Sequence, residues 1–116
     1  MKIRVRDHVK VAGDKMAKVG LSSTARTQLD LYCVAPGQSQ SVHRHEGEDK
    51  IYYVLEGAGR FSVGGVEERL EPGEAVVAPA GIDHGLVNDG GELLLVLVVV
   101  APPPAHMARP TSGHAG

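Results

Sequence analysis

The sequence predicts an all-β domain whose short strands form a sandwich or a barrel. Three observations predict it: apolar and polar residues alternate over short stretches, 15 Gly and 7 Pro are scattered between these stretches, and aromatic residues make up only 3% of the chain. The hydrophobic fraction of 42% and the charged fraction of 22% are ordinary globular values, which argues against a disordered or fibrous chain. A length of 116 residues suits one domain.

The first half of the chain supplies four candidate segments. Residues 1–22 are polar with two short aliphatic patches, and we expect an arm or an edge strand there. Alternation from Ser23 to Val34 predicts a half-buried strand, which Pro36-Gly37 ends. Residues 41–45 form a further strand candidate, and residues 50–57 are rich in β-forming residues and end at a glycine.

The second half continues with a hairpin and three more strands. Residues 60–63 and 66–70 flank Gly64-Gly65, a pair that can adopt the positive φ angles of a two-residue turn. The further strand candidates are residues 75–78, 84–87 and 93–100, which are separated by Gly, Pro, Asn and Asp.

Two segments are apolar on both faces. The run LLLVLVVV at residues 93–100 has no polar face, and neither has KIYYVL at residues 50–55, so each needs a second apolar layer. The other sheet of the barrel or a partner subunit can provide that layer, and the small size of the domain favours a homodimer. We expect one domain over residues 1–104 and a flexible tail over residues 105–116, beyond Pro102–Pro104.

Composition argues against several classes of protein. The formal net charge of -2 and the pI near 6.3 do not favour binding to nucleic acid. Cys33 is the single cysteine, which excludes an intrachain disulfide, a thiolate zinc finger and a CxxC redox site, and we expect it to be a small buried hydrophobic residue. No signal peptide is visible, and the longest apolar run is far shorter than the ~18 residues of a membrane span. We therefore expect a cytoplasmic protein.

Three histidines are the candidate site. His43 and His45 are two residues apart, so on a strand they face the same side, and His84 on a neighbouring strand can complete a facial set. Neutral imidazoles suit Fe, Mn, Ni, Cu or Zn rather than Ca or Mg. By itself, an HxH pair on a polar strand would be interpreted as two solvated side chains.

The surrounding residues favour the site, because they resemble the two motifs of the cupin superfamily. The first runs from Gly37 through His43 and His45 to Gly57, and the second runs from Gly73 through Pro79, Gly81 and His84 to Asn88. The resemblance implies a jelly-roll (double-stranded β-helix) barrel of the RmlC-like type, with a divalent metal (Fe, Mn, Ni or Zn) held by His43, His45 and His84. It also implies that the motif glycines and Pro79 shape the strand ends.

The sequence departs from the family pattern at Lys50, where a glutamate usually supplies a fourth ligand. A protonated lysine cannot bind a metal ion, and Asp49 would replace the glutamate only if a bulge turned it inward. Lys50 either points into the barrel and pairs with an anionic substrate or turns outward at the start of its strand. We favour the outward orientation, because lysines near strand ends usually reach water.

Other polar candidates are weaker. Tyr52 shares a face with Lys50 and either lines the pocket or is buried with its hydroxyl bonded to a backbone carbonyl. Gln38 and Gln40 lie before the histidines and are expected to be loop residues. His8, His106 and His114 lie outside the motifs and receive no role.

The fold alone does not decide the activity. The first hypothesis is a metal-dependent dioxygenase, decarboxylase or isomerase-like enzyme that acts on a small oxygen-rich anion, with Lys50 and Tyr52 as candidate substrate contacts. The alternative is a non-catalytic binding protein or sensor for a small molecule, and a storage or structural role ranks last.

Overall fold

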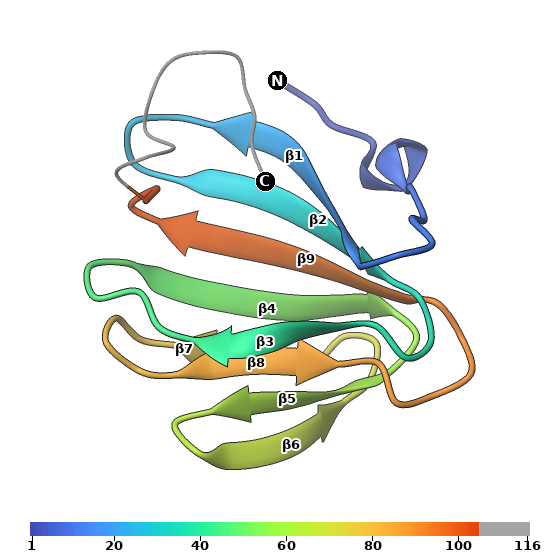
Figure 1. Cartoon of the computed structure of the whole chain (residues 1–116). Helices are drawn as coiled ribbons and strands as arrows, with labels where there is room; N and C mark the ends of the chain where they lie inside the picture. The colour runs from blue at the N-terminus through green and yellow to red at the C-terminus, as the bar shows by residue number, and fades with distance from the viewer. Residues whose placement is uncertain (105–116) are drawn as a thin grey trace.

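The computed structural model describes residues 1–104, which form two antiparallel sheets that face each other (Figure 1). One sheet has the strand order β1-β2-β9-β4-β7 and the other β3-β8-β5-β6. The predicted all-β jelly roll is confirmed, whereas the expected tail at 105–116 lies outside the described residues. The elements are η1 (Val5–His8), β1 (Ala17–Ser23), β2 (Gln28–Val34), β3 (Ser39–His43), β4 (Asp49–Glu56), β5 (Gly59–Val63), β6 (Val66–Leu70), β7 (Ala75–Ala78), β8 (His84–Val87) and β9 (Leu94–Ala101).

The main correction to the expected strands concerns the segment from Ser23 to Val34. Ser23 ends the edge strand β1, and β2 begins only at Gln28. Between them, the hydroxyl of Thr24 accepts hydrogen bonds from the backbone N–H groups of Arg26 and Thr27, at 3.1 Å each. This side-chain capping stabilises a turn where alternation alone predicts a continuous strand.

The expected turns are present. Gly64 and Gly65 adopt φ angles of 60° and 84°, as the two-residue hairpin requires. Gly57 has a φ of 77°, and a Cβ atom there would lie 2.3 Å from the carbonyl oxygen of Leu93. Only glycine therefore allows β4 to end beside the start of β9.

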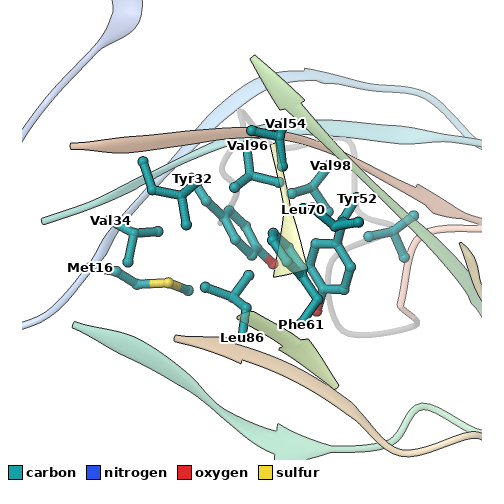
Figure 2. Packing of buried hydrophobic residues seen from close by; sticks show 12 residues of the cluster. Met16, Tyr32, Val34, Tyr52, Val54, Phe61, Leu70, Leu86, Val96 and Val98 are labelled. Atoms are coloured by element: carbon teal, nitrogen blue, oxygen red, sulfur yellow. The ribbon is translucent and has the colours of Figure 1, made fainter. Parts of the chain in front are cut away.

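β9 lies in the middle of its sheet, and both of its faces are apolar. Its inner face packs in the cluster that contains Tyr32, Tyr52 and Phe61, which lies between the two sheets (Figure 2). On its outer face, Leu95 belongs to a second cluster with the buried Cys33, and residues of the N-terminal segment pack against that cluster. The chain therefore supplies part of the second apolar layer itself.

The interior becomes polar along the barrel. Successive inward positions of β4 are Val54, Tyr52 and Lys50. Across β9, Tyr52 is in register with Asp30 of β2, and Lys50 is in register with Gln28. Aliphatic side chains therefore fill one end, and charged and amide side chains lie at the other. Within residues 1–104, no helix combines the length and the apolar character needed to cross a bilayer.

Candidate metal centre

His43, His45 and His84 converge at the polar end of the barrel. One ligand nitrogen from each lies within 4.8 Å of the others. The ring centroids are 4.5 Å apart for His43 and His84, 4.9 Å for His43 and His45, and 5.7 Å for His45 and His84. The expected convergence is confirmed, while binding of a metal by these residues stays a prediction.

A bulge in β3 places His43 opposite His84. The register of β3 against β8 shifts between Gln40 and His43, so both residues pair with inward positions although they are three positions apart on β3 and their partners are two apart on β8. Gly85 makes room for the bulge, because a Cβ atom there would lie 2.8 Å from the carbonyl oxygen of Gln40. This crowding explains why a residue without a side chain follows His84.

His45 lies beyond the end of β3, which corrects the expected strand over residues 41–45. Strand alternation therefore does not explain why it faces the same point as His43. Its backbone carbonyl accepts a hydrogen bond from the N–H of Gly81 at 2.8 Å, which ties this loop to the turn before β8. Gly81 can make that turn because it adopts a φ of 80°.

Each histidine has a partner for Nδ1. The Nδ1 atom of His43 lies 2.8 Å from the carbonyl oxygen of Ser41, and that of His84 lies 3.0 Å from the carbonyl oxygen of Ile82. A carbonyl oxygen only accepts, so these Nδ1 atoms carry the proton and each Nε2 keeps a free lone pair. The carboxylate of Glu48 lies 3.3 Å from Nδ1 of His45.

The Nε2 atom of His84 fits a metal ion. It is buried and has no hydrogen-bond partner among the described residues. A buried polar atom without a partner is rare in folded proteins and calls for a ligand. Burial lowers the pKa of all three imidazoles, and for His84 burial together with Lys50 and the other two histidines lowers it to about 4. The rings are therefore neutral donors at physiological pH, as metal binding requires.

Lys50 points into the barrel, so the expected outward orientation is wrong. Its side chain is 3% exposed, and Nζ lies 5.3 Å from the ring centroids of both Tyr32 and Tyr52. The strand already begins at Asp49, and Lys50 occupies an inward position between Ala78 and Val100. Burial, reinforced by the charge of Lys18, lowers the pKa of Lys50 to about 7, although Asp30 opposes the shift.

The two acidic residues before Lys50 have different positions. Asp49 faces outward, and its carboxylate accepts a hydrogen bond from the N–H of Ala80 at 2.9 Å. It therefore takes no part in the histidine cluster. Glu48 is the residue that sequence reasoning missed: its contact with His45 is of the kind that orients a metal-binding imidazole. Its position three residues after His45 was the available signal.

Tyr52 is fully buried, and its hydroxyl donates to Oε1 of Gln40 at 2.7 Å rather than to a backbone carbonyl. Nε2 of Gln40 donates to the hydroxyl of Tyr32 at 3.2 Å. Gln40 is thus a buried residue of β3, which corrects its assignment to a loop. Gln38 does lie in the turn before β3, where its side chain bonds to Ala35 and Ala12.

Comparison with known proteins agrees with this fold. The Cupin domain family matches residues 30–100, so the chain belongs to the cupin family. An oxalate-binding protein of Thermotoga maritima is 37% identical over 65 residues, which cover 56% of this chain and 54% of that protein. Acireductone dioxygenase 1 of Vitis vinifera is 34% identical over 79 residues, which cover 62% of this chain and 42% of that enzyme.

A solved structure resembles almost the whole domain. TT1209 of Thermus thermophilus is 45% identical, with a TM-score of 0.85, and the match covers 88% of this chain and 98% of that one. By contrast, the chain spans about half the length of the two curated relatives described above.

Proposed function

We propose that the protein is a metal-dependent enzyme that acts on a small oxygen-rich anion. The observation that carries this proposal is the set of three imidazoles with their ligand nitrogens within 4.8 Å of one another. Three neutral nitrogen donors suit Fe, Mn, Ni or Zn. They leave the full charge of a divalent ion uncompensated, so an anionic oxygen ligand is the matching substrate group.

Each side chain has a distinct part in this proposal. His43, His45 and His84 hold the ion through Nε2, and a metal ion so held supplies Lewis-acid chemistry with open coordination positions. Lys50 provides the charge that attracts the anion, and Tyr52 lines the interior beside it. Lys50 and Tyr52 are both buried, which strengthens these electrostatic interactions.

The side chains favour some reactions over others. Asp30 is the buried carboxylate among residues 1–104, and the amide of Gln28 donates to both of its oxygens. The other carboxylate beside the histidines, that of Glu48, contacts Nδ1 of His45, so neither is an evident free general base among the described residues, which disfavours hydrolysis. Dioxygenase, decarboxylase or isomerase-like chemistry on a small acid remains, and the name of the acireductone dioxygenase relative supports this class.

A second candidate is a binding protein or sensor without catalysis. The name of the Thermotoga maritima relative, an oxalate-binding protein, supports it. The interior lysine in place of a fourth ligand also supports it, because a cation can hold an anion without taking part in its conversion.

The test uses protein purified without nickel resin. Metal analysis is expected to find one transition-metal ion per chain in the wild type and in the control His8→Ala, which changes an exposed histidine, and none in His84→Ala. O₂ uptake or CO₂ release with a panel of small carboxylates and diols then separates the candidates. Ligand binding without turnover favours the binding protein, and a metal-free wild type that binds ligand normally contradicts the metal-dependent proposal.

We also propose that a second copy of the chain covers the outer face of the larger sheet. Ile51, Tyr53 and Val77 are 37%, 39% and 53% exposed there. Ile51 pairs with both Val77 and Val99, so these side chains form one continuous apolar face. A face of this kind favours a symmetric dimer.

A further inference from the structure

A cavity lies between an edge of one sheet and an edge of the other. β1 is an edge strand of one sheet and β3 of the other (Figure 1). The cavity has a volume of about 570 Å³, and its lining includes Lys15, Lys18, Met16, Ser39 and Gln40. The histidines are not part of this lining, so the cavity is separate from the candidate metal centre.

Two of the lining residues also reach the barrel interior. Nζ of Lys18 lies 5.4 Å from the centroid of the Tyr32 ring, and Nζ of Lys50 lies 5.3 Å from the same centroid. Gln40 bonds to the hydroxyls of Tyr32 and Tyr52. The cavity therefore adjoins the polar end of the interior. Lys18 belongs to the cavity lining and also lies close to the buried Tyr32 ring.

The interior holds more positive than negative charge. Asp30 acts electrostatically on both Lys18 and Lys50, and it is the one buried carboxylate among residues 1–104. One carboxylate thus faces two ammonium groups, next to three imidazoles without charge. Lys50 is buried whereas Lys18 is exposed on β1, so the two charges extend from the surface into the interior and would both attract a bound anion.

This positive charge reaches the histidines. Lys50 and Lys18 both contribute to the lowered pKa of His43 and of His45. A single ring separates Lys50 from His84: the Tyr52 centroid lies 5.3 Å from Nζ of Lys50 and 6.1 Å from the centroid of His84. Lys50 also contributes to the lowered pKa of His84, so its charge acts on all three imidazoles.

We propose that Lys18 and Lys50 form an anion-binding subsite that holds one carboxylate of a small dicarboxylate, while the other carboxylate binds at the three histidines. The ligand enters through the cavity between β1 and β3, where Lys15 adds positive charge at the rim. The assignment deepens the proposed function, on which it rests, by naming the substrate class. It also gives the lysine at position 50 a specific task.

The test is calorimetric titration of the Mn²⁺-loaded protein with malonate and, as the matched monoanion, acetate. We expect Lys18→Met to weaken malonate binding by about 10- to 100-fold, the range for a charged hydrogen bond, and to leave acetate binding unchanged. Lys18→Arg is expected to retain most of the affinity. Lys10→Met, which removes an exposed lysine outside the cavity lining, is the charge-matched control.

The outcomes distinguish the subsite from the metal centre. Equal malonate affinity in wild type and Lys18→Met, or equal loss in Lys10→Met, overturns the subsite even if Mn²⁺ binds. If Mn²⁺ does not bind, the proposed function fails, but malonate binding to the metal-free protein that depends on Lys18 still supports the subsite. Melting temperatures of the variants show whether a loss of binding reflects unfolding. Lys50→Met is a second test, because the proposal predicts that it too weakens malonate binding and leaves acetate binding unchanged.

Discussion

Lys50→Met is expected to stabilise the metal-free protein and to remove a rise of stability with pH. In the folded chain the Lys50 ammonium is buried, and its pKa is about 7 instead of 10.5. A difference of this size corresponds to a destabilisation on the order of 5 kcal/mol while Lys50 is charged. Met has a similar length and no charge, so it fills the same space without this penalty.

The sign of the pH effect follows from proton binding. Between the folded pKa of about 7 and the unfolded value of 10.5, the unfolded chain holds a proton on Lys50 that the folded chain has lost. Stability therefore rises with pH across this window, by at most about 1.4 kcal/mol per pH unit. Below the window both states are protonated, and the full penalty remains.

The assay is urea unfolding of wild type, Lys50→Met and the exposed-lysine control Lys10→Met, after removal of metal by a chelator. Relative to Lys50→Met, the wild type should gain about 2 kcal/mol between about pH 8 and about pH 9.5, and Lys10→Met should behave as the wild type does. If wild type and Lys50→Met have the same pH slope, Lys50 is not charged and buried as described, and this account of its energetics is wrong.

Three further perturbations address the histidines and the outer face. Lys50→Glu should raise transition-metal affinity by at least about 10-fold, because it removes a cation and adds a carboxylate ligand; unchanged affinity in a metal titration would mean that position 50 does not reach the ion. Gly85→Ala should lower metal affinity and also cost about 1–3 kcal/mol of stability, because the new methyl group overlaps β3. Urea unfolding and metal titration test this. If the variant has the stability and the metal affinity of the wild type, the bulge does not have the role assigned to it. Tyr53→Asp should convert a dimer into a monomer in analytical ultracentrifugation with its melting behaviour otherwise little changed, whereas a wild type that sediments as a monomer would contradict the proposed interface.

The sequence predicted the parts of this protein that local physics decides. Glycines at residues 64 and 65 specify a hairpin because few other residues adopt positive φ, and the apolar run of residues 93–100 requires cover on both faces. These inferences depend only on the residues themselves and on their immediate neighbours. The meeting of His43, His45 and His84, by contrast, was implied by the resemblance of the two motifs to those of the cupin superfamily.

The tertiary structure decided how each side chain is oriented. His45 lies beyond its strand, and a bulge opposite Gly85 aligns His43, so alternation along the chain gave the convergence for the wrong reason. The direction of Lys50 depended on where β4 begins, which its pairing with β9 and β7 determines. The roles of Gln40 and Glu48 likewise arise from contacts with residues that only the folded chain brings together.

There is a physical reason why the sequence predicted some of these features and only the tertiary structure decided the others. Turn chemistry and hydrophobic periodicity act over a few residues, so the sequence alone determined that this chain forms short strands joined by tight turns. Electrostatic surroundings and burial sum over several strands at once. For that reason only the folded barrel decided that Lys50 is buried near the histidines, and that Asp30 interacts with both Lys50 and Lys18.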